Sequence, residues 1–251
     1  MIRSILCLIV LLIGGGLRPP SLEAAGPTVA ELLQRTDDLM RGNSSEGTFT
    51  MHVKTARWDR SMTMKVWSEG TEKSLVQILA PAKDRGTATL KVDQNIWNYL
   101  PKVDRTIKVP ASMMSGSWMG SHFTNDDLVK HSRFDTDYDC EFTAQPEGDE
   151  GHYVIDCIPK PDAPVVWGKV VVKIRDSDEL PEEVAYFDEE DELIRTFAYL
   201  DFGELGGRRL PLRTQVIPAD KPEEFTEIVY EEMKFDVKLP KSTFTLQALK
   251  R

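Results

Sequence analysis

The sequence predicts a mainly β protein with a few helices, built on one antiparallel sheet that curls into a barrel or a strongly curved half-barrel. Three observations support this fold class. Apolar and polar residues alternate over many short segments beyond residue 48, turn residues separate these segments, and a long stretch of helical spacing occurs only near the N-terminus. Sequential strands with tight connections form an antiparallel meander, and a dozen of them in one sheet must curl. With 251 residues, 41% of them hydrophobic, the chain can bury a sizeable core.

The first 25 residues have the pattern of a cleaved signal peptide. Arg3 gives a positive start, residues 5–13 form an unbroken apolar run, and Ala24 and Ala25 are the small residues after which a signal peptidase cuts. A membrane anchor is the weaker alternative, because Arg18 ends the apolar stretch short of the roughly 20 residues that span a bilayer. We therefore expect export and cleavage after Ala24 or Ala25.

Residues 26–251 are expected to form a single domain, because no Pro-rich or Gly/Ser-rich linker divides them. This domain begins with an amphipathic helix predicted over residues 28–41. Thr28 and Glu31 have the spacing of a capping box. The apolar residues that recur at helical intervals are Val29, Leu32, Leu33, Leu39 and Met40.

Strands with one apolar face follow the helix. In the first strand Phe49, Met51 and Val53 alternate with polar residues. In the second strand Met62, Met64 and Val66 do the same. Further strands are predicted at residues 74–79, 86–92, 95–100, 106–109, 140–144, 152–157, 165–175, 182–187, 193–202, 208–217 and 225–235.

Two cysteines flank a predicted hairpin whose centre is the turn-rich run 146–151. If the hairpin is symmetric about this run, Cys140 lies opposite Cys157 and Phe142 lies opposite Ile155. Opposed residues at a non-hydrogen-bonded position have Cα atoms about 4.5 Å apart, which suits a disulfide. Export brings the chain into oxidising conditions, so we predict a disulfide worth about 3 kcal/mol. A metal pair or a catalytic thiol is the alternative, but the spacing lacks the paired CxxC motifs of a zinc site.

Charge and motifs favour neither a nucleic-acid partner nor an enzyme. The net charge is −10, whereas nucleic-acid binders need a basic stripe. His122 and His131 lie near Asp126 and Asp127, so a metal or acid–base site is conceivable. Residues 125–128 are better explained as the cap and first turn of a short helix. The motifs of hydrolases, zinc proteases and phosphate-binding loops do not occur. We therefore expect no catalytic residues, no metal and no cofactor.

Residues 110–123 interrupt the strand pattern with an apolar, Met-rich segment punctuated by small residues. Met113, Met114 and Met119 lie within it, together with Trp118 and Phe123. Methionine is a flexible side chain that suits apolar surfaces with variable partners. The segment is therefore either a plug that fills one end of the sheet as core or a mobile lid over an apolar cavity.

Four stretches of the sequence resemble the outer-membrane-lipoprotein-sorting-like family, the relatives of the LolA carrier. They are residues 81–86 (PAKDRG), 96–102 (IWNYLPK), 113–121 (MMSGSWMGS) and 123–128 (FTNDDL). The resemblance implies an incomplete antiparallel barrel around an apolar cavity, closed by helices and loops, that shields acyl chains in the periplasm. It also implies an inner-membrane transporter as a partner, either of the resistance-nodulation-division class or of another class. Arg85 and Arg105 are the candidates, by chain position, for the arginine that regulates the LolA lid.

Two functions are compatible with these features. The first is a periplasmic carrier of a lipid, of lipoprotein acyl chains or of a similar hydrophobic cargo. The second is an accessory module that docks on an envelope transporter through the Met-rich segment. A carrier needs a deep cavity, whereas a docking module has a filled sheet and turns its Met and Trp side chains outward. The residues predicted to line or cover the cavity of a carrier are Met51, Met62, Met64, Val66, Trp97, Tyr99, Met113, Met114, Trp118, Met119 and Phe123.

Overall fold

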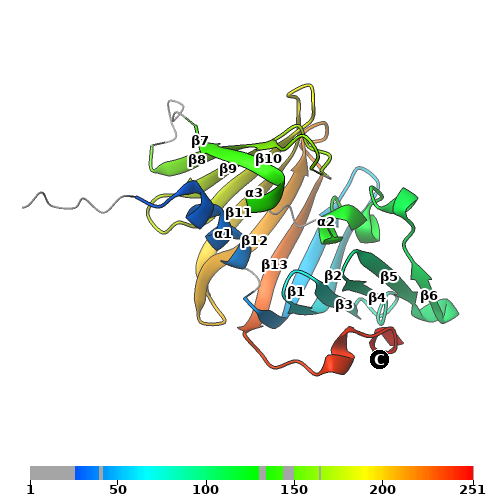
Figure 1. Cartoon of the computed structure of the whole chain (residues 1–251). Helices are drawn as coiled ribbons and strands as arrows, with labels where there is room; N and C mark the ends of the chain where they lie inside the picture. The colour runs from blue at the N-terminus through cyan, green and yellow to red at the C-terminus, as the bar shows by residue number, and fades with distance from the viewer. Residues whose placement is uncertain (1–25, 40–41, 130–133, 144–149, 164, 251) are drawn as a thin grey trace, which may run out of the picture.

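The computed structural model of the protein describes residues 26–39, 42–129, 134–143, 150–163 and 165–250. The predicted signal peptide lies outside these residues. Within them the strands form a single thirteen-stranded antiparallel sheet that stays open instead of closing into a barrel (Figure 1). The strands are β1 (Ser44–Lys54), β2 (Asp59–Glu69), β3 (Lys73–Ala80), β4 (Ala88–Val92), β5 (Asn95–Leu100), β6 (Arg105–Lys108), β7 (Tyr138–Phe142), β8 (His152–Pro159), β9 (Lys169–Arg175), β10 (Pro181–Phe187), β11 (Leu193–Leu205), β12 (Arg208–Pro218) and β13 (Phe225–Phe235).

The sheet consists of two meanders joined along β1 and β13. One meander runs from β1 outward to β6, the other from β13 outward to β7, so β6 and β7 are the two edges. The chain must therefore cross from one edge to the other between residues 109 and 137. This crossing contains helix α2 (Asn125–Val129), which lies over the concave side of the curved sheet (Figure 1). The topology thus places the apolar segment where a cover for the sheet is needed.

Each predicted strand segment corresponds to one strand, which confirms the fold class. Several boundaries differ by a few residues, and the strand predicted at residues 165–175 begins only at Lys169. Gly168 packs so closely on the β10–β11 turn that a Cβ atom would lie 2.2 Å from the Asp188 carbonyl oxygen. Its amide donates to the Phe187 carbonyl at 2.9 Å. The preceding residues leave the sheet, and Val165 and Trp167 pack against the core.

Helices cover one part of the concave face. Helix α1 (Val29–Leu39) begins at the predicted capping box, in which the Thr28 amide donates to the Glu31 carboxylate at 2.8 Å. Leu32 and Leu33 of this helix are buried against helix α3 (Phe134–Asp137) and strands β7 to β10. The predicted end of the helix, residues 40–41, lies outside the described part of the chain. This cluster covers the concave face over strands β7 to β10 and leaves β11 to β13 facing a cavity.

The C-terminal residues cover part of the opposite, convex face. Phe244 and Leu249 belong to two short 3₁₀ helices, η4 (Lys241–Phe244) and η5 (Ala248–Lys250). They pack with Leu75 of β3 and Leu90 of β4 in a cluster that is separate from the concave face. Strands β3 to β5 are therefore buried on both faces, which accounts for the run of four buried residues at the start of β4.

The predicted disulfide is present. Cys140 of β7 and Cys157 of β8 are directly opposed, and their sulfurs are bonded across a Cα separation of 4.1 Å. Phe142 and Ile155 are also paired, as the symmetric hairpin predicts. Strand β7 is an edge strand and pairs with one neighbour only, so it has fewer inter-strand hydrogen bonds than the inner strands. The disulfide adds a covalent link between this strand and β8.

Replacing Cys140 and Cys157 together by alanine should lower the free energy of unfolding by about 3 kcal/mol, because the cross-link restricts the unfolded chain. Urea unfolding of the mature protein, with and without the substitutions, measures this difference. Alkylation of the wild-type protein before and after reduction should reveal two thiols only after reduction. An unchanged unfolding free energy would contradict the stabilising role.

Candidate functional site

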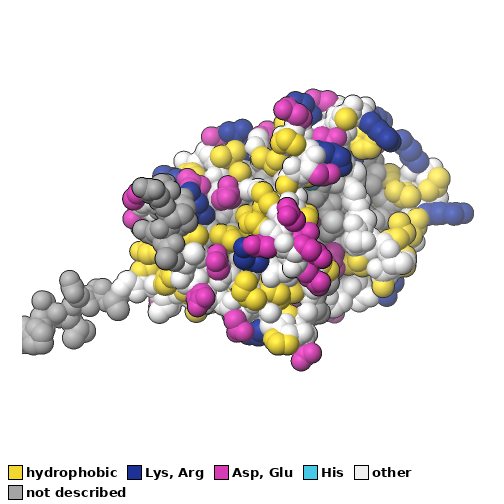
Figure 2. All heavy atoms as spheres, turned by 90° about the horizontal axis from the view of Figure 1, so that it is seen from above, with side chains coloured by type: hydrophobic (Ala, Val, Ile, Leu, Met, Phe, Trp, Pro, Cys, Tyr) yellow, Lys and Arg dark blue, Asp and Glu magenta, His cyan; other side chains and the backbone are white. Residues whose placement is uncertain are grey.

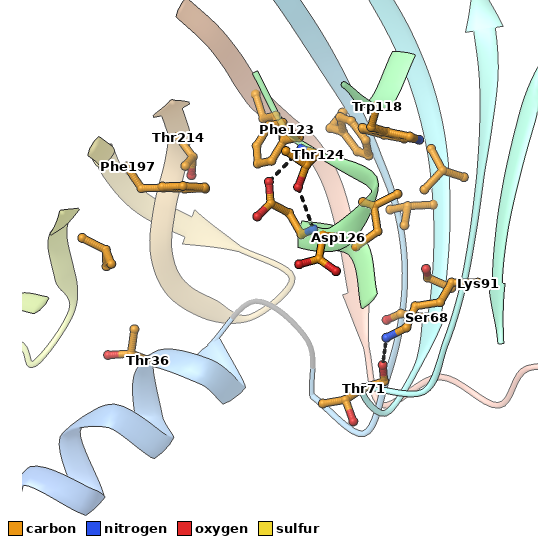
Figure 3. Close-up of a pocket in the computed structure, with 18 of the residues that line it drawn as sticks. Thr36, Ser68, Thr71, Lys91, Trp118, Phe123, Thr124, Asp126, Phe197 and Thr214 are labelled. Atoms are coloured by element: carbon orange, nitrogen blue, oxygen red, sulfur yellow. Dashed lines mark hydrogen bonds between the residues drawn. The ribbon is translucent and has the colours of Figure 1, made fainter. Parts of the chain in front are cut away.

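The concave face of the sheet contains a cavity of about 580 Å³. This volume lies in the range of about 300–1,000 Å³ that holds one small-molecule ligand. The walls come from both meanders and from the segment that crosses between β6 and β7. Aromatic and aliphatic side chains dominate the wall, among them Phe49, Val66, Trp118, Phe123, Phe197 and Tyr230. Figure 3 shows Trp118, Phe123 and Phe197 together at one end of this space.

Residues 110–129, here named the lid segment, cover the cavity. Trp118 is 4% exposed, packs on the buried side chains of β1 to β3, and donates its indole N–H to the Thr89 hydroxyl of β4 at 3.1 Å. Phe123 meets Phe197 of β11 edge to face, with ring centroids 5.7 Å apart. The lid segment therefore contacts both meanders and bridges the opening between them.

The lid segment is also held by its own backbone. The Trp118 amide donates to the Phe123 carbonyl at 2.7 Å, and the Asn125 side-chain amide donates to the Met113 and Gly116 carbonyls, each at 3.1 Å. The predicted helix cap is present at α2, where the Asp127 carboxylate accepts from the Thr124 amide at 2.7 Å. Asp126 and Asp127 are thus part of a short helix start, as the sequence indicates.

A buried ion pair joins the lid segment to the sheet. Arg195 of β11 donates two hydrogen bonds to the Asp127 carboxylate, at 2.8 and 2.6 Å. The arginine side chain is only 8% exposed, and its guanidinium lies over the rings of Trp167, Tyr186 and Phe197 at 4.6 to 5.1 Å. Burial raises the pKa of Tyr186, so this phenol stays neutral and Asp127 balances the arginine charge.

The other end of the cavity is polar. Ser45 of β1, Ser68 of β2, Ser74 of β3 and Lys91 of β4 are direct cross-strand neighbours and form one row across the sheet. All four line the cavity, and Ser45 and Lys91 are each only 3% exposed. Lys91 donates to the Thr71 carbonyl, and Figure 3 shows these two residues with Ser68, away from Phe123 and Phe197. The cavity is therefore amphipathic, with one apolar and one polar end.

The structure places three of the predicted cavity residues, Val66, Trp118 and Phe123, in the cavity wall. Met51, Met62 and Met64 project from the same concave face but are at most 2% exposed. Trp118 packs directly on them, with Met119, Phe123 and Leu128 around it, so they form a core layer beneath the lid segment. Of the two remaining methionines, Met114 is half-buried and Met113 is 58% exposed.

Trp97 and Tyr99 lie away from the cavity. They share one face of β5, as predicted, but this face is the convex one, where both pack with the C-terminal cluster. Their neighbours Ile96 and Asn98 face the concave side, where Asn98 accepts a hydrogen bond from the Thr89 hydroxyl at 2.7 Å. The predicted role of Trp97 and Tyr99 in the cavity is therefore corrected, because strand alternation defines two faces but not which of them is concave.

The two arginines proposed from chain position do not hold the lid segment. Arg85 donates to the Leu79 carbonyl at 2.9 Å, and Arg105 lies exposed on edge strand β6. Arg195, which the sequence analysis missed, makes the contact instead. Arg195 lies on the same face of β11 as Phe197 and Tyr199. The alternation of these three residues in the sequence could have indicated an arginine on the apolar face of this strand.

The described histidine of the lid segment, His122, forms its contacts with residues near the start of β13. His122 bonds the Thr226 hydroxyl at 2.9 Å and lies 3.4 Å from the Glu224 carboxylate, while His131 lies outside the described residues. No group of three or more His, Cys, Asp or Glu side chains suited to a metal ion occurs among the residues that the structure describes.

The surface seen from above mixes apolar side chains with acidic and basic ones (Figure 2).

An open antiparallel half-barrel, a lid segment and a concave amphipathic cavity together define a LolA-like fold. Solved structures that share it include three that match most of the chain. A DUF1329 family protein from Desulfovibrio piger is 21% identical, with a TM-score of 0.76 over 88% of this chain and 97% of that chain. An outer-membrane lipoprotein-sorting protein domain from Vibrio parahaemolyticus is 22% identical, with a TM-score of 0.73 over 88% and 98% of the two chains. A LolA superfamily protein from Nitrosomonas europaea is 24% identical, with a TM-score of 0.71 over 88% and 99%.

A family model described as an uncharacterized protein matches residues 70–251. The chain belongs to this family. Its fold is that of the LolA-like structures. No curated protein matches the sequence. In the part of the chain that the structure describes, no helix has the length and apolar character needed to cross a bilayer.

Replacing Arg195 by methionine should loosen the lid segment, because it leaves the partly buried Asp127 carboxylate without its charged partner. Loss of one member of a buried ion pair costs about 3 kcal/mol. Hydrogen exchange should accelerate at the Asn125 and Asp126 amides, which bond to carbonyls within the lid segment. Arg213→Met is the control, since Arg213 pairs with Asp201 and Glu227 on the outer face, away from the lid segment. Equal hydrogen exchange in both variants would contradict the role of the Arg195–Asp127 pair in holding the lid segment.

Proposed function

We propose that this protein is a periplasmic carrier that holds one hydrophobic or amphiphilic molecule in the cavity of the half-barrel. The observation that carries the proposal is the cavity itself, which the lid segment covers without filling. A protein core of ordinary packing contains few voids larger than a water molecule, so a space of this size calls for an occupant. The lipoprotein-sorting name of one structural neighbour agrees with this proposal.

The apolar end suits an acyl chain. Each methylene group withdrawn from water contributes about 0.8 kcal/mol, so a chain of ordinary length supplies ample binding energy. The lid segment provides the route for entry and exit, because its contacts with β11 depend on Phe123 and the Arg195–Asp127 pair. An inner-membrane transporter of the resistance-nodulation-division class is the proposed partner for loading or release, in keeping with the sequence resemblance.

The alternative of an accessory module that docks through the lid segment has less support. A docking surface requires the large apolar side chains of the segment to face outward. Met113 does so, with 58% of its surface exposed, but Trp118 is buried and Met114 and Met119 are half-buried. The segment therefore directs most of its apolar surface toward the sheet, as a cavity cover does.

Replacing Phe123 by aspartate should weaken binding of monomyristin, a neutral amphiphile with one acyl chain, by at least about tenfold, because a carboxylate would face the apolar end. Met113→Asp is the matched control, since it places the same charge on the exposed side of the lid segment. Isothermal titration calorimetry of both variants measures the difference.

Val66→Phe tests the same site without adding a charge, because it fills part of the cavity from β2. Circular dichroism should show the sheet intact in all three variants. Equal monomyristin affinity in Phe123→Asp, Val66→Phe and the wild type would contradict the carrier function.

A further inference from the structure

Strand β6, at one edge of the sheet, and the turn before it expose large apolar side chains. Leu100, Val103 and Ile107 have 39%, 59% and 47% of their surface exposed. Leu100 ends β5, Val103 ends the short 3₁₀ helix η1 (Pro101–Val103), and Ile107 lies in β6. Aliphatic side chains gathered in this way on a turn and an edge strand indicate a contact surface, because such positions are normally polar.

Basic side chains alternate with these aliphatic ones. Lys102, Arg105 and Lys108 are all exposed. Figure 2 shows Lys and Arg side chains beside apolar ones at the end of the molecule where Figure 1 places β6, on the right in both views. The residues named here the β6 edge patch are Leu100, Lys102, Val103, Arg105, Ile107 and Lys108.

Two further basic side chains lie beside the β6 edge patch. Exposed Lys83 and Arg85 belong to the connection between β3 and β4. This connection lies against η1, since a Cβ atom on Gly86 would be 3.6 Å from the Pro101 side chain. Residues 81–109 contain six Lys and Arg against three Asp, a net charge of +3, although the whole chain has −10. The edge of the sheet is therefore a basic region on an acidic protein.

The positive charges of the β6 edge patch are not balanced within the protein. Lys102 and Arg105 form no ion pair with any residue that the structure describes. Asp104 lies between them in sequence, but its carboxylate is 2.7 Å from the Lys250 ammonium group. Other surface lysines are neutralised locally, such as Lys65 by Glu46 at 2.7 Å. The charge of the patch is thus available to an anionic partner.

The opposite edge of the sheet differs in charge. Phe142 of β7 and Ile158 of β8 are 45% and 48% exposed there. The exposed charged residues of β7, however, are Asp139 and Glu141. Both edges therefore expose apolar side chains, but of the two only the β6 edge combines them with positive charge.

The shape of the β6 edge favours a lipid surface over a strand of another protein. Strand β6 has four residues and carries Arg105 and Lys108, and short, charged edge strands resist the addition of a further strand. Ile107 is paired with Asn98 of the concave face, whereas Lys108 is paired with Trp97 of the convex face, so the patch wraps around the edge. A fluid bilayer surface can meet such a rounded patch without matching its shape. Lys and Arg then reach the lipid phosphates while aliphatic side chains enter the apolar boundary.

We propose that the β6 edge patch docks the protein on the surface of a bilayer that contains anionic lipids. The lid segment starts at residue 110, directly after β6, so docking through this edge brings the start of the lid segment to the bilayer. The inference concerns where the protein binds a membrane surface and does not depend on what the cavity holds.

Co-sedimentation of the mature protein with vesicles tests this proposal. One set of vesicles is phosphatidylcholine alone, and the other is an equal mixture of phosphatidylcholine and phosphatidylglycerol. The wild-type protein should bind the mixed vesicles at least about tenfold more tightly, and added salt should weaken this binding. Replacing Lys102 and Arg105 together by glutamine should weaken it at least about tenfold, because each basic side chain near an anionic surface contributes to binding. Ile107→Ser should weaken it by about fivefold through the loss of apolar contact.

Arg209→Gln combined with Lys234→Gln is the matched control, because it removes the same charge from exposed positions on β12 and β13. This control should bind the mixed vesicles as the wild type does. Equal weakening in both double variants would show an effect of net charge alone and would overturn the proposal. So would a wild-type protein that does not prefer the mixed vesicles.

Phe123→Asp separates docking from binding in the cavity. This variant should still bind the mixed vesicles, whereas the Lys102 and Arg105 variant should still bind monomyristin. Loss of vesicle binding in Phe123→Asp, with the Lys102 and Arg105 variant unaffected, would assign vesicle binding to the cavity and overturn the docking proposal. The carrier function would stand in that case.

Discussion

The structure depends on the curvature of one long antiparallel sheet whose edges do not meet. Pairing of β1 with β13 joins two meanders into a half-barrel, and the twist of so many strands forces one face to become concave. The side chains of the concave face leave a cavity of about 580 Å³ between them. The remaining space must be covered by other parts of the chain or occupied by a ligand, and this protein combines the two.

The cover comes from the segment that the topology requires to cross between the edges. Its hold on the sheet is of two kinds. Trp118 packs as core on the methionines of β1 and β2, whereas the Arg195–Asp127 pair and the Phe123–Phe197 contact fasten the segment to β11. The first contact buries a large apolar surface and is difficult to break, while the second is one ion pair and one aromatic contact. For the proposed carrier, we expect the cover to open on the β11 side.

Much of the fold was predictable from the sequence, because alternation at period two marks each strand and the cysteine hairpin follows from its symmetric turn. The site was less predictable. Alternation placed Trp97 and Tyr99 together but could not show that their face is convex, since the C-terminal residues that bury it are distant in sequence. Lys91 has the appearance of a solvent-facing residue between Leu90 and Val92 until the register aligns it with three serines. Contacts between distant strands, which no local pattern encodes, define the polar end.

The proposed carrier function requires a ligand in the cavity. Native mass spectrometry of the mature protein, purified from periplasm without detergent and followed by solvent extraction, tests it most directly. We expect a bound species with the mass of an acylated amphiphile, released when the protein unfolds. A protein that keeps its bare mass, even after incubation with lipids of the cell envelope, would contradict it.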